Sequence, residues 1–140
     1  MPVEKVDTIV VGAGQAGIAA SEHLGKHGIS HVVLERDRIA EKWRTARWDS
    51  LVANGPAWHD RFPNREFEDF DYDGFPDKES VADYFVDYVD QIKAPVRCGV
   101  TVHHVARLKE GGEFFVKTSQ GDFEARHIIA ATGAFQNPVI

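Results

Sequence analysis

The feature that most constrains this chain is a glycine pattern near its N-terminus. Gly12, Gly14 and Gly17 form G-x-G-x-x-G between a β-branched run at Val6–Val11 and helical spacing at Ala16–His27. In such a loop the first glycine permits a tight turn, the second lets a pyrophosphate approach the backbone, and the third allows close packing of helix on strand. The unpaired N–H groups and the dipole of the helix start attract the anion. The sequence therefore predicts a strand, loop and helix that hold a dinucleotide.

A second apolar run, His31–Glu35, predicts the next strand, and Gly28 before it predicts the end of the helix. Units of this kind carry parallel strands. Glu35 occupies the strand end where dinucleotide-binding folds place an acid. A carboxylate there accepts hydrogen bonds from a ribose 2′-hydroxyl and repels a 2′-phosphate, so the site favours FAD or NAD over NADP. The alternative without function is a glycine-rich turn beside a solvated Glu35.

The remaining pattern predicts an α/β fold. Residues 36–78 are rich in Trp, Phe, Pro, Gly and Asp and predict ordered loops, with a short helix at Ile39–Arg44. An apolar stripe predicts a helix over Glu79–Ala94 with Ser80 as its cap. We expect strands at Val96–Cys98, Val100–Leu108, Glu113–Thr118, Asp122–Ala125 and His127–Ala131. The predicted fold is one Rossmann-like three-layer FAD/NAD(P)-binding domain over residues 1–140. It has a parallel sheet and a small antiparallel meander before the last strand, and it is incomplete at its C-terminus.

Composition excludes several classes of partner. The net charge of -6 without a Lys/Arg cluster argues against nucleic acid and anionic membranes. The chain has no apolar run of membrane-spanning length and no signal-peptide pattern. Its single cysteine, Cys98, excludes an internal disulfide, is expected to be buried, and fits a reducing, cytoplasmic location. The histidines lack metal-ligand spacing, so no metal site is expected.

Further motifs run along the whole chain. They are VVGAGQAG at Val10–Gly17, LER at Leu34–Arg36, KWRTARWDSL at Lys42–Leu51, DGFPDKESVADYF at Asp73–Phe85, APVRCGVTV at Ala94–Val102, and IIAATGAFQNPVI at Ile128–Ile140, where Pro138 follows an ATG. Together they resemble the N-terminal part of flavin-containing monooxygenases and their Baeyer–Villiger relatives, especially a bacterial group of monooxygenase-like flavoproteins. The resemblance extends over essentially the entire sequence.

The resemblance implies that the glycine motif binds FAD. It implies that Trp43 and Arg44 lie along the FAD near its pyrophosphate and flavin, and that the backbone of Val102 meets the adenine. The alternatives are a core aromatic for Trp43 and a surface salt bridge for Arg44. Trp48 and Trp58 are expected to pack rather than to take part in chemistry. The predicted cofactor-binding residues are Gly12, Gly14, Gln15, Ala16, Gly17, Glu35, Arg36, Trp43, Arg44, Val102, Ala131, Thr132 and Gly133.

Asn54 is the one candidate for a catalytic role. In flavin-containing monooxygenases an asparagine after a similar S-L-x-x-N stretch lies beside the flavin, and SLVAN at Ser50–Asn54 matches that spacing. A turn residue before Gly55 and Pro56 is an equally good interpretation.

The implied parent function is that of an NADPH-dependent flavin monooxygenase. NADPH would reduce FAD, and the reduced flavin would transfer an oxygen atom to a small-molecule substrate, a soft nucleophile or a ketone. Residues 1–140 carry no second glycine motif for NADPH. We therefore expect the chain alone to bind FAD or its ADP half and to turn over poorly.

Two other hypotheses stay open at the sequence level. One is a non-catalytic FAD- or ADP-binding module or subunit, and the other is half of an NAD-dependent dehydrogenase. A missing last strand would also leave a sheet edge unpaired, which predicts a homo-oligomer formed through that edge.

Overall fold

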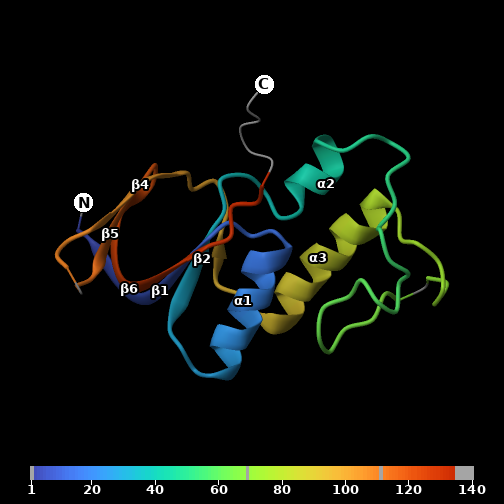
Figure 1. Ribbon diagram of the computed structural model, residues 1–140, viewed down its shortest axis with the longest axis horizontal. Helices are drawn as coiled ribbons and strands as arrows, with labels where there is room; N and C mark the ends of the chain where they lie inside the picture. The colour runs from blue at the N-terminus through green and yellow to red at the C-terminus, as the bar shows by residue number, and fades with distance from the viewer. Residues whose placement is uncertain (1, 69, 111, 135–140) are drawn as a thin grey trace. The chain divides into compact units, whose positions relative to one another are not determined.

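The computed structural model describes residues 2–68, 70–110 and 112–134. The chain forms two compact units (Figure 1). The sheet unit consists of Met1–Arg38 and Ala94–Ile140, and the α3 unit consists of Ile39–Lys93. Pro138, which follows the ATG motif, lies outside the described residues.

The sheet unit is a six-stranded mixed sheet in the order β3-β2-β1-β6-β5-β4. Strands β3, β2, β1 and β6 pair in parallel, whereas β4, β5 and β6 pair antiparallel. Helix α1 (Gln15–Lys26) connects β1 to β2. The strands are β1 (Glu4–Val11), β2 (His31–Leu34), β3 (Val96–Arg97), β4 (Val102–Arg107), β5 (Phe114–Thr118) and β6 (Gly121–Ala130). The predicted α/β, Rossmann-like class is confirmed.

One element differs from the sequence prediction. Asp122–Ala125 and His127–Ala131, predicted as two strands, form the single strand β6. Its first half pairs antiparallel with β5, and residues from Phe123 onward pair in parallel with β1. The two predicted strands left a gap at Arg126, but this side chain is exposed and the strand continues through it. Strand β6 is therefore both the last strand of the meander and the parallel strand that was predicted to follow the meander.

The sheet curls, and this curl creates the third layer. Val10 faces α1, since its Cγ1 would lie 3.4 Å from a Cβ on Gly17, and Ile9 therefore faces the opposite side of the sheet. On that side Ile9 belongs to a buried cluster that joins Leu34 of β2 to Val116 of β5, although these strands are three places apart in the order. Helix α1 thus covers one face, and the antiparallel strands cover the other.

Arg97 on β3 links the parallel strands through its contacts with β1 and β6. Its guanidinium donates two hydrogen bonds of 2.7 Å to the carboxylate of Glu4 on β1 and lies 5.6 Å from the ring centroid of Phe123 on β6. These hydrogen bonds lower the pKa of Glu4. The pair is about half exposed, so it stabilises the fold by only about 0–1 kcal/mol.

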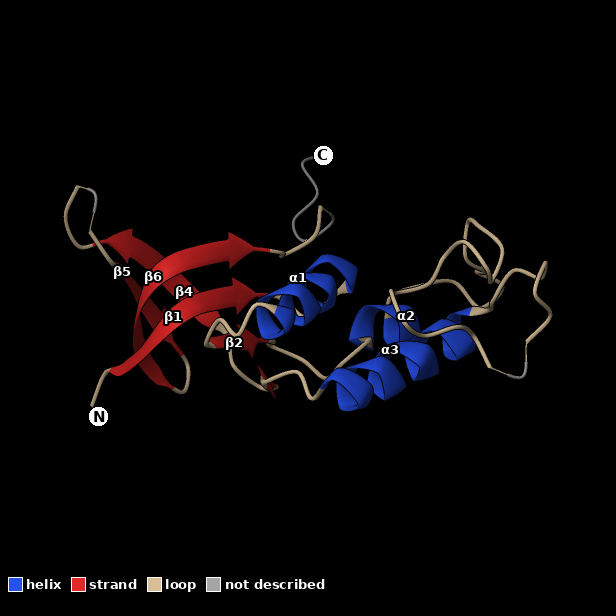
Figure 2. Cartoon of the chain, turned by 90° about the horizontal axis from the view of Figure 1, so that it is seen from below, coloured by secondary structure: helices blue, strands red, loops and turns tan. Residues whose placement is uncertain are grey.

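The α3 unit contains α2 (Glu41–Thr45), α3 (Lys78–Ile92) and the ordered loops between them (Figure 2). The cap of α3 is Asp77, whose carboxylate accepts a hydrogen bond of 2.7 Å from the Ser80 N–H. The predicted cap at Ser80 is wrong, because an aspartate three residues earlier satisfies the free N–H group of the first turn.

Two side chains, one predicted to pack and one predicted to be buried, are exposed. Trp48 is 65% exposed in the loop after α2, so the expected packing role is wrong for this residue. Cys98 is also exposed, in the turn after β3. Trp48 lies outside the periodic segments, so the sequence offered no face to which its side chain could be assigned. Cys98 is exposed because β3 ends at Arg97 rather than at the predicted Cys98.

Stacked aromatic rings form the centre of the α3 unit. Phe62 stacks on Tyr84 and Tyr88, with ring centroids 5.8 Å and 4.4 Å apart. The Tyr84 hydroxyl accepts a hydrogen bond from the Phe62 N–H at 2.6 Å and donates one to the carbonyl of Arg65 at 2.7 Å. The Tyr84 hydroxyl thus holds the loop that contains Phe62 and Arg65 against α3. These two hydrogen bonds explain how residues without regular structure stay ordered.

Removing this hydroxyl should destabilise the chain. In Tyr84→Phe, the Phe62 N–H and the Arg65 carbonyl each lose a buried partner, and we expect the free energy of unfolding to fall by about 1–3 kcal/mol. The matched control is Tyr72→Phe, because Tyr72 is 64% exposed, and it should change stability by less than about 0.5 kcal/mol. Denaturant unfolding followed by near-UV circular dichroism measures both. Equal stability of the two variants would contradict the role given to the hydroxyl.

Candidate functional site

The glycine loop joins the ends of three strands. The Gly12 N–H donates to the carbonyl of Leu34 at 2.8 Å, and the Ala131 N–H donates to the carbonyl of Val11 at 2.9 Å. Gly12 has φ of 103°, a conformation that L side chains rarely adopt, and an added Cβ would overlap the carbonyl oxygen of Ala131. The first glycine therefore lets the ends of β1 and β6 meet.

The other two glycines serve different purposes. A Cβ on Gly17 would overlap the carbonyl oxygen of Gly12, so this glycine lets α1 approach the loop. A Cβ on Gly14 would meet no atom within 4 Å. Gly14 is the N-cap of α1 and is exposed together with Gln15 and Ala16, and no side chain caps the helix. The helix start thus offers N–H groups beside open space, an arrangement that suits an anion.

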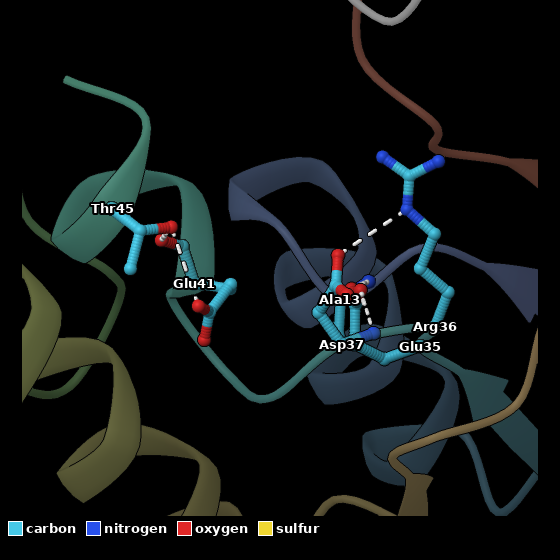
Figure 3. Close-up of polar contacts among 6 residues, drawn as sticks. All are labelled: Ala13, Glu35, Arg36, Asp37, Glu41 and Thr45. Atoms are coloured by element: carbon cyan, nitrogen blue, oxygen red, sulfur yellow. Dashed lines mark hydrogen bonds and ion pairs between the residues drawn. The ribbon is translucent and has the colours of Figure 1, made fainter.

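Glu35 lies directly against this loop (Figure 3). Its Oε2 accepts a hydrogen bond of 2.9 Å from the Ala13 N–H, and its Oε1 accepts one of 3.0 Å from the Asp37 N–H. Bonds from N–H groups to a carboxylate are stronger than those between neutral groups. Glu35 therefore fixes the loop as well as facing it.

Arg36 and the segment before Val102 flank Glu35. The backbone carbonyl of Glu35 accepts a hydrogen bond of 2.9 Å from the Val100 N–H, which brings the chain leading into Val102 close to the strand end. Arg36 is exposed, and its Nε donates to the Asp37 carboxylate at 3.2 Å. The carboxylate of Asp37 thus offsets the positive charge of Arg36.

The end of β6 completes the group in the sheet unit. Thr132 and Gly133 are exposed just after this strand, and Gly133 has φ of 78°. The fold therefore brings together the glycine loop, Glu35 and the ATG segment at one edge of the sheet. Sequence reasoning missed Ala13 and Asp37, which act through backbone N–H groups that no side-chain pattern reveals.

Trp43, Arg44 and Asn54 belong to the α3 unit. The Trp43 ring is half-buried and packs edge-to-face against Phe85, with centroids 6.3 Å apart. Asn54 is exposed immediately before Gly55. Their predicted places at the flavin stay predictions.

Arg44 has two carboxylate partners on α3. It donates to Asp83 and Glu79, each at 2.9 Å. The hydrogen bond that Arg44 donates to Asp83 is the main cause that raises the pKa of Arg44. Any phosphate that binds this guanidinium would compete with both carboxylates.

Two features are absent from the part of the chain that the structure describes. No three His, Cys, Asp or Glu side chains there gather as metal ligands would. Nor does any helix among those residues have the length and apolar character needed to cross a membrane.

Comparison with known proteins assigns this arrangement to a family. The family model described as pyridine nucleotide-disulphide oxidoreductase matches residues 9–140. An uncharacterized CzcO-like oxidoreductase of Geobacillus kaustophilus is 35% identical over 136 residues, which cover 96% of this chain and 38% of that protein. The chain therefore spans well under half the length of this relative.

Two further proteins extend the comparison. The probable indole-3-pyruvate monooxygenase YUCCA1 of Arabidopsis thaliana is 30% identical over 132 residues, covering 93% of this chain and 32% of that protein. The structure of a flavin-containing monooxygenase from Stenotrophomonas maltophilia matches with a TM-score of 0.83 and 27% identity, covering 97% of this chain and 42% of that one.

The three glycines should respond differently to the same substitution. Gly12→Ala requires a strained backbone, and Gly17→Ala forces overlap with a carbonyl oxygen, so each should lower the free energy of unfolding by about 1–3 kcal/mol. Gly14→Ala should change it by less than about 0.5 kcal/mol, because its Cβ enters open space. Thermal unfolding of the three variants measures this contrast. A Gly14→Ala variant as unstable as the other two would contradict the geometry of the loop.

Proposed function

Because the chain belongs to the pyridine nucleotide-disulphide oxidoreductase family, we propose that residues 1–140 are the FAD-binding domain of a flavin-dependent monooxygenase or related oxidoreductase. The observation that carries the proposal is the carboxylate of Glu35 held against the Gly12–Gly17 loop. The relatives named as monooxygenases support the reaction class.

The residues of the loop fit a dinucleotide. The pyrophosphate would lie in the open space at Gly14, against the first N–H groups of α1. The ribose hydroxyls would donate to Glu35, whose carboxylate offers about four lone-pair positions. Backbone N–H groups use two of them. The segment Ala131–Gly133 would face the pyrophosphate from the end of β6.

Charge at the strand end favours FAD over NADP. Glu35 and Asp37 would both repel a 2′-phosphate, and Asp37 already pairs with Arg36, the cation nearest in sequence. When bound, the flavin supplies the hydride and oxygen chemistry. The chain's own residues bind and orient it. In this proposal Trp43 and Arg44 contact the flavin end, Val102 contacts the adenine, and Asn54 is a catalytic residue.

NADPH and a small-molecule substrate are proposed only for a longer parent protein. Residues 1–140 carry a single G-x-G-x-x-G motif, and the proposal assigns it to FAD. NADPH oxidation by this chain alone is therefore expected to be slow. We also propose a cytoplasmic location, in keeping with the single cysteine.

The purified chain should carry or take up FAD. We expect a yellow protein whose nucleotide, released by denaturation, has the mass of FAD. Glu35→Gln loses charge-assisted hydrogen bonds worth about 1.5–3 kcal/mol, so FAD affinity should fall by roughly 10- to 100-fold. Gly14→Ala should also weaken FAD while leaving stability unchanged, because its methyl group occupies the pyrophosphate space. Fluorescence titration of flavin measures the affinities.

The matched control is Glu113→Gln, an exposed glutamate before β5, which should bind FAD as the unaltered chain does. A folded chain that binds NAD and not FAD would support a dehydrogenase instead. FAD binding that is insensitive to both Glu35→Gln and Gly14→Ala would mean that the nucleotide lies elsewhere.

We further propose that the chain associates through the edge of its sheet. The longer edge strand is β4, on which Val105 is 37% exposed. A β-bulge between Val102 and His104 makes this edge a poorer template than a regular strand. We therefore expect a weak dimer at high concentration in light scattering, and a monomer for Val105→Lys. A monomer at every concentration would rule out this association.

A further inference from the structure

A second group of chemically active residues lies in the loops of the α3 unit. His59 Nδ1 lies 2.7 Å from Asp60 Oδ1, and the other carboxylate oxygen, Oδ2, accepts a hydrogen bond of 2.7 Å from the Gly55 N–H. An ionised carboxylate only accepts hydrogen bonds, so in neutral His59 the proton of this bond is on Nδ1. The other ring nitrogen, Nε2, is then a proton acceptor.

The turn that carries the pair is constructed around the carboxylate. The carbonyl of Pro56 accepts hydrogen bonds from the His59 N–H at 2.9 Å and the Asp60 N–H at 3.0 Å. A Cβ on Gly55 would lie 2.5 Å from Asp60 Oδ1, so a larger residue there would displace the carboxylate from this position. The side chain of Asp60 is 31% exposed and that of His59 is 66% exposed. A fixed carboxylate thus holds an accessible imidazole, which is the arrangement of a general base and its orienting group.

Exposed aromatic rings adjoin the imidazole. Trp58 packs edge-to-face against His59, with centroids 5.6 Å apart, and stacks with Tyr72 at 6.3 Å. Trp58 is 45% exposed and Tyr72 is 64% exposed. The Trp58 N–H donates to the carbonyl of Tyr72 at 3.3 Å, which keeps the two segments together. These rings offer apolar surface next to the imidazole, and a planar apolar molecule can cover such a surface.

We propose that His59 and Asp60 form an acid–base dyad for a planar substrate that bears an acidic O–H or N–H group and lies against Trp58 and Tyr72. Nε2 takes the proton, and the electron pair of the broken bond stays on the substrate oxygen or nitrogen. The carboxylate of Asp60 stabilises the imidazolium that forms. Asp60 is a positioning residue, and through the Gly55 N–H it also fixes the peptide that follows Asn54.

The inference deepens the proposed function by naming a substrate class, and it rests on that function only for the redox chemistry. The dyad is composed entirely of residues in the α3 unit. Its test therefore uses the 140-residue chain without added FAD, so failure of the dyad and failure of FAD binding give different results.

The test measures the tautomer of His59 by nuclear magnetic resonance. In chain labelled with ¹⁵N-histidine at mildly alkaline pH, we expect His59 to carry its proton on Nδ1, with His59→Gln assigning the signal. Phenol, a ring with an O–H group, should shift the Nε2 resonance, whereas anisole, which lacks that group, should not. Asp60→Asn should move the proton of His59 from Nδ1 to Nε2, because its amide NH₂ can donate to Nδ1 while its oxygen still accepts from the Gly55 N–H.

The matched control is Asp90→Asn, an exposed aspartate on α3 that should leave the His59 signals unchanged. A proton on Nε2 in the unaltered chain overturns the proposal, as does an equal response to phenol and anisole. An unchanged tautomer in folded Asp60→Asn overturns it as well. If Asp60→Asn fails to fold, the tautomer and the phenol response of the unaltered chain decide the outcome.

Discussion

The contact on which the candidate site depends is the close approach of backbone to backbone at Gly12. The carbonyl of Ala131 lies where a Cβ of Gly12 would be, and the carbonyl of Gly12 lies where a Cβ of Gly17 would be. Two successive contacts without side chains thus bring the end of β6, the loop and the start of α1 together. Hydrogen bonds from Gly12 to Leu34 and from Ala131 to Val11 fix the arrangement. Any side chain at these positions would separate the elements that form the anion site.

Glu35 depends on this contact and also supports it. Its carboxylate can reach the Ala13 N–H only because the loop turns back over the end of β2. One side chain thus combines a structural role, holding the loop, with the proposed role of binding ribose. The two roles are compatible because a carboxylate accepts more hydrogen bonds than the two that backbone N–H groups supply.

Sequence patterns were informative where periodicity or a glycine rule applied. The parallel strands, α1, α3 and the position of Glu35 beside the glycines follow from apolar runs and from the motif. The patterns failed where one strand pairs with two neighbouring strands and where a loop side chain is exposed rather than packed. Strand β6 continues through Arg126 and His127 because exposed polar residues do not prevent backbone pairing. Composition alone does not tell which loop side chains pack against a neighbour. Trp48, which was expected to pack, is exposed.

The sequence by itself determined the strand–loop–helix unit, because its glycines permit contacts that other residues forbid. It also determined the acid at the strand end, because the strand's length places Glu35 there. Only the tertiary structure decided that the sheet curls, since the cluster of Leu34 and Val116 joins strands far apart in the order. Only the tertiary structure paired Asp60 with His59 and Gly55, and Arg44 with two carboxylates of α3. Such contacts depend on the path of irregular loops, and that path depends on hydroxyls such as that of Tyr84, which no periodic pattern records.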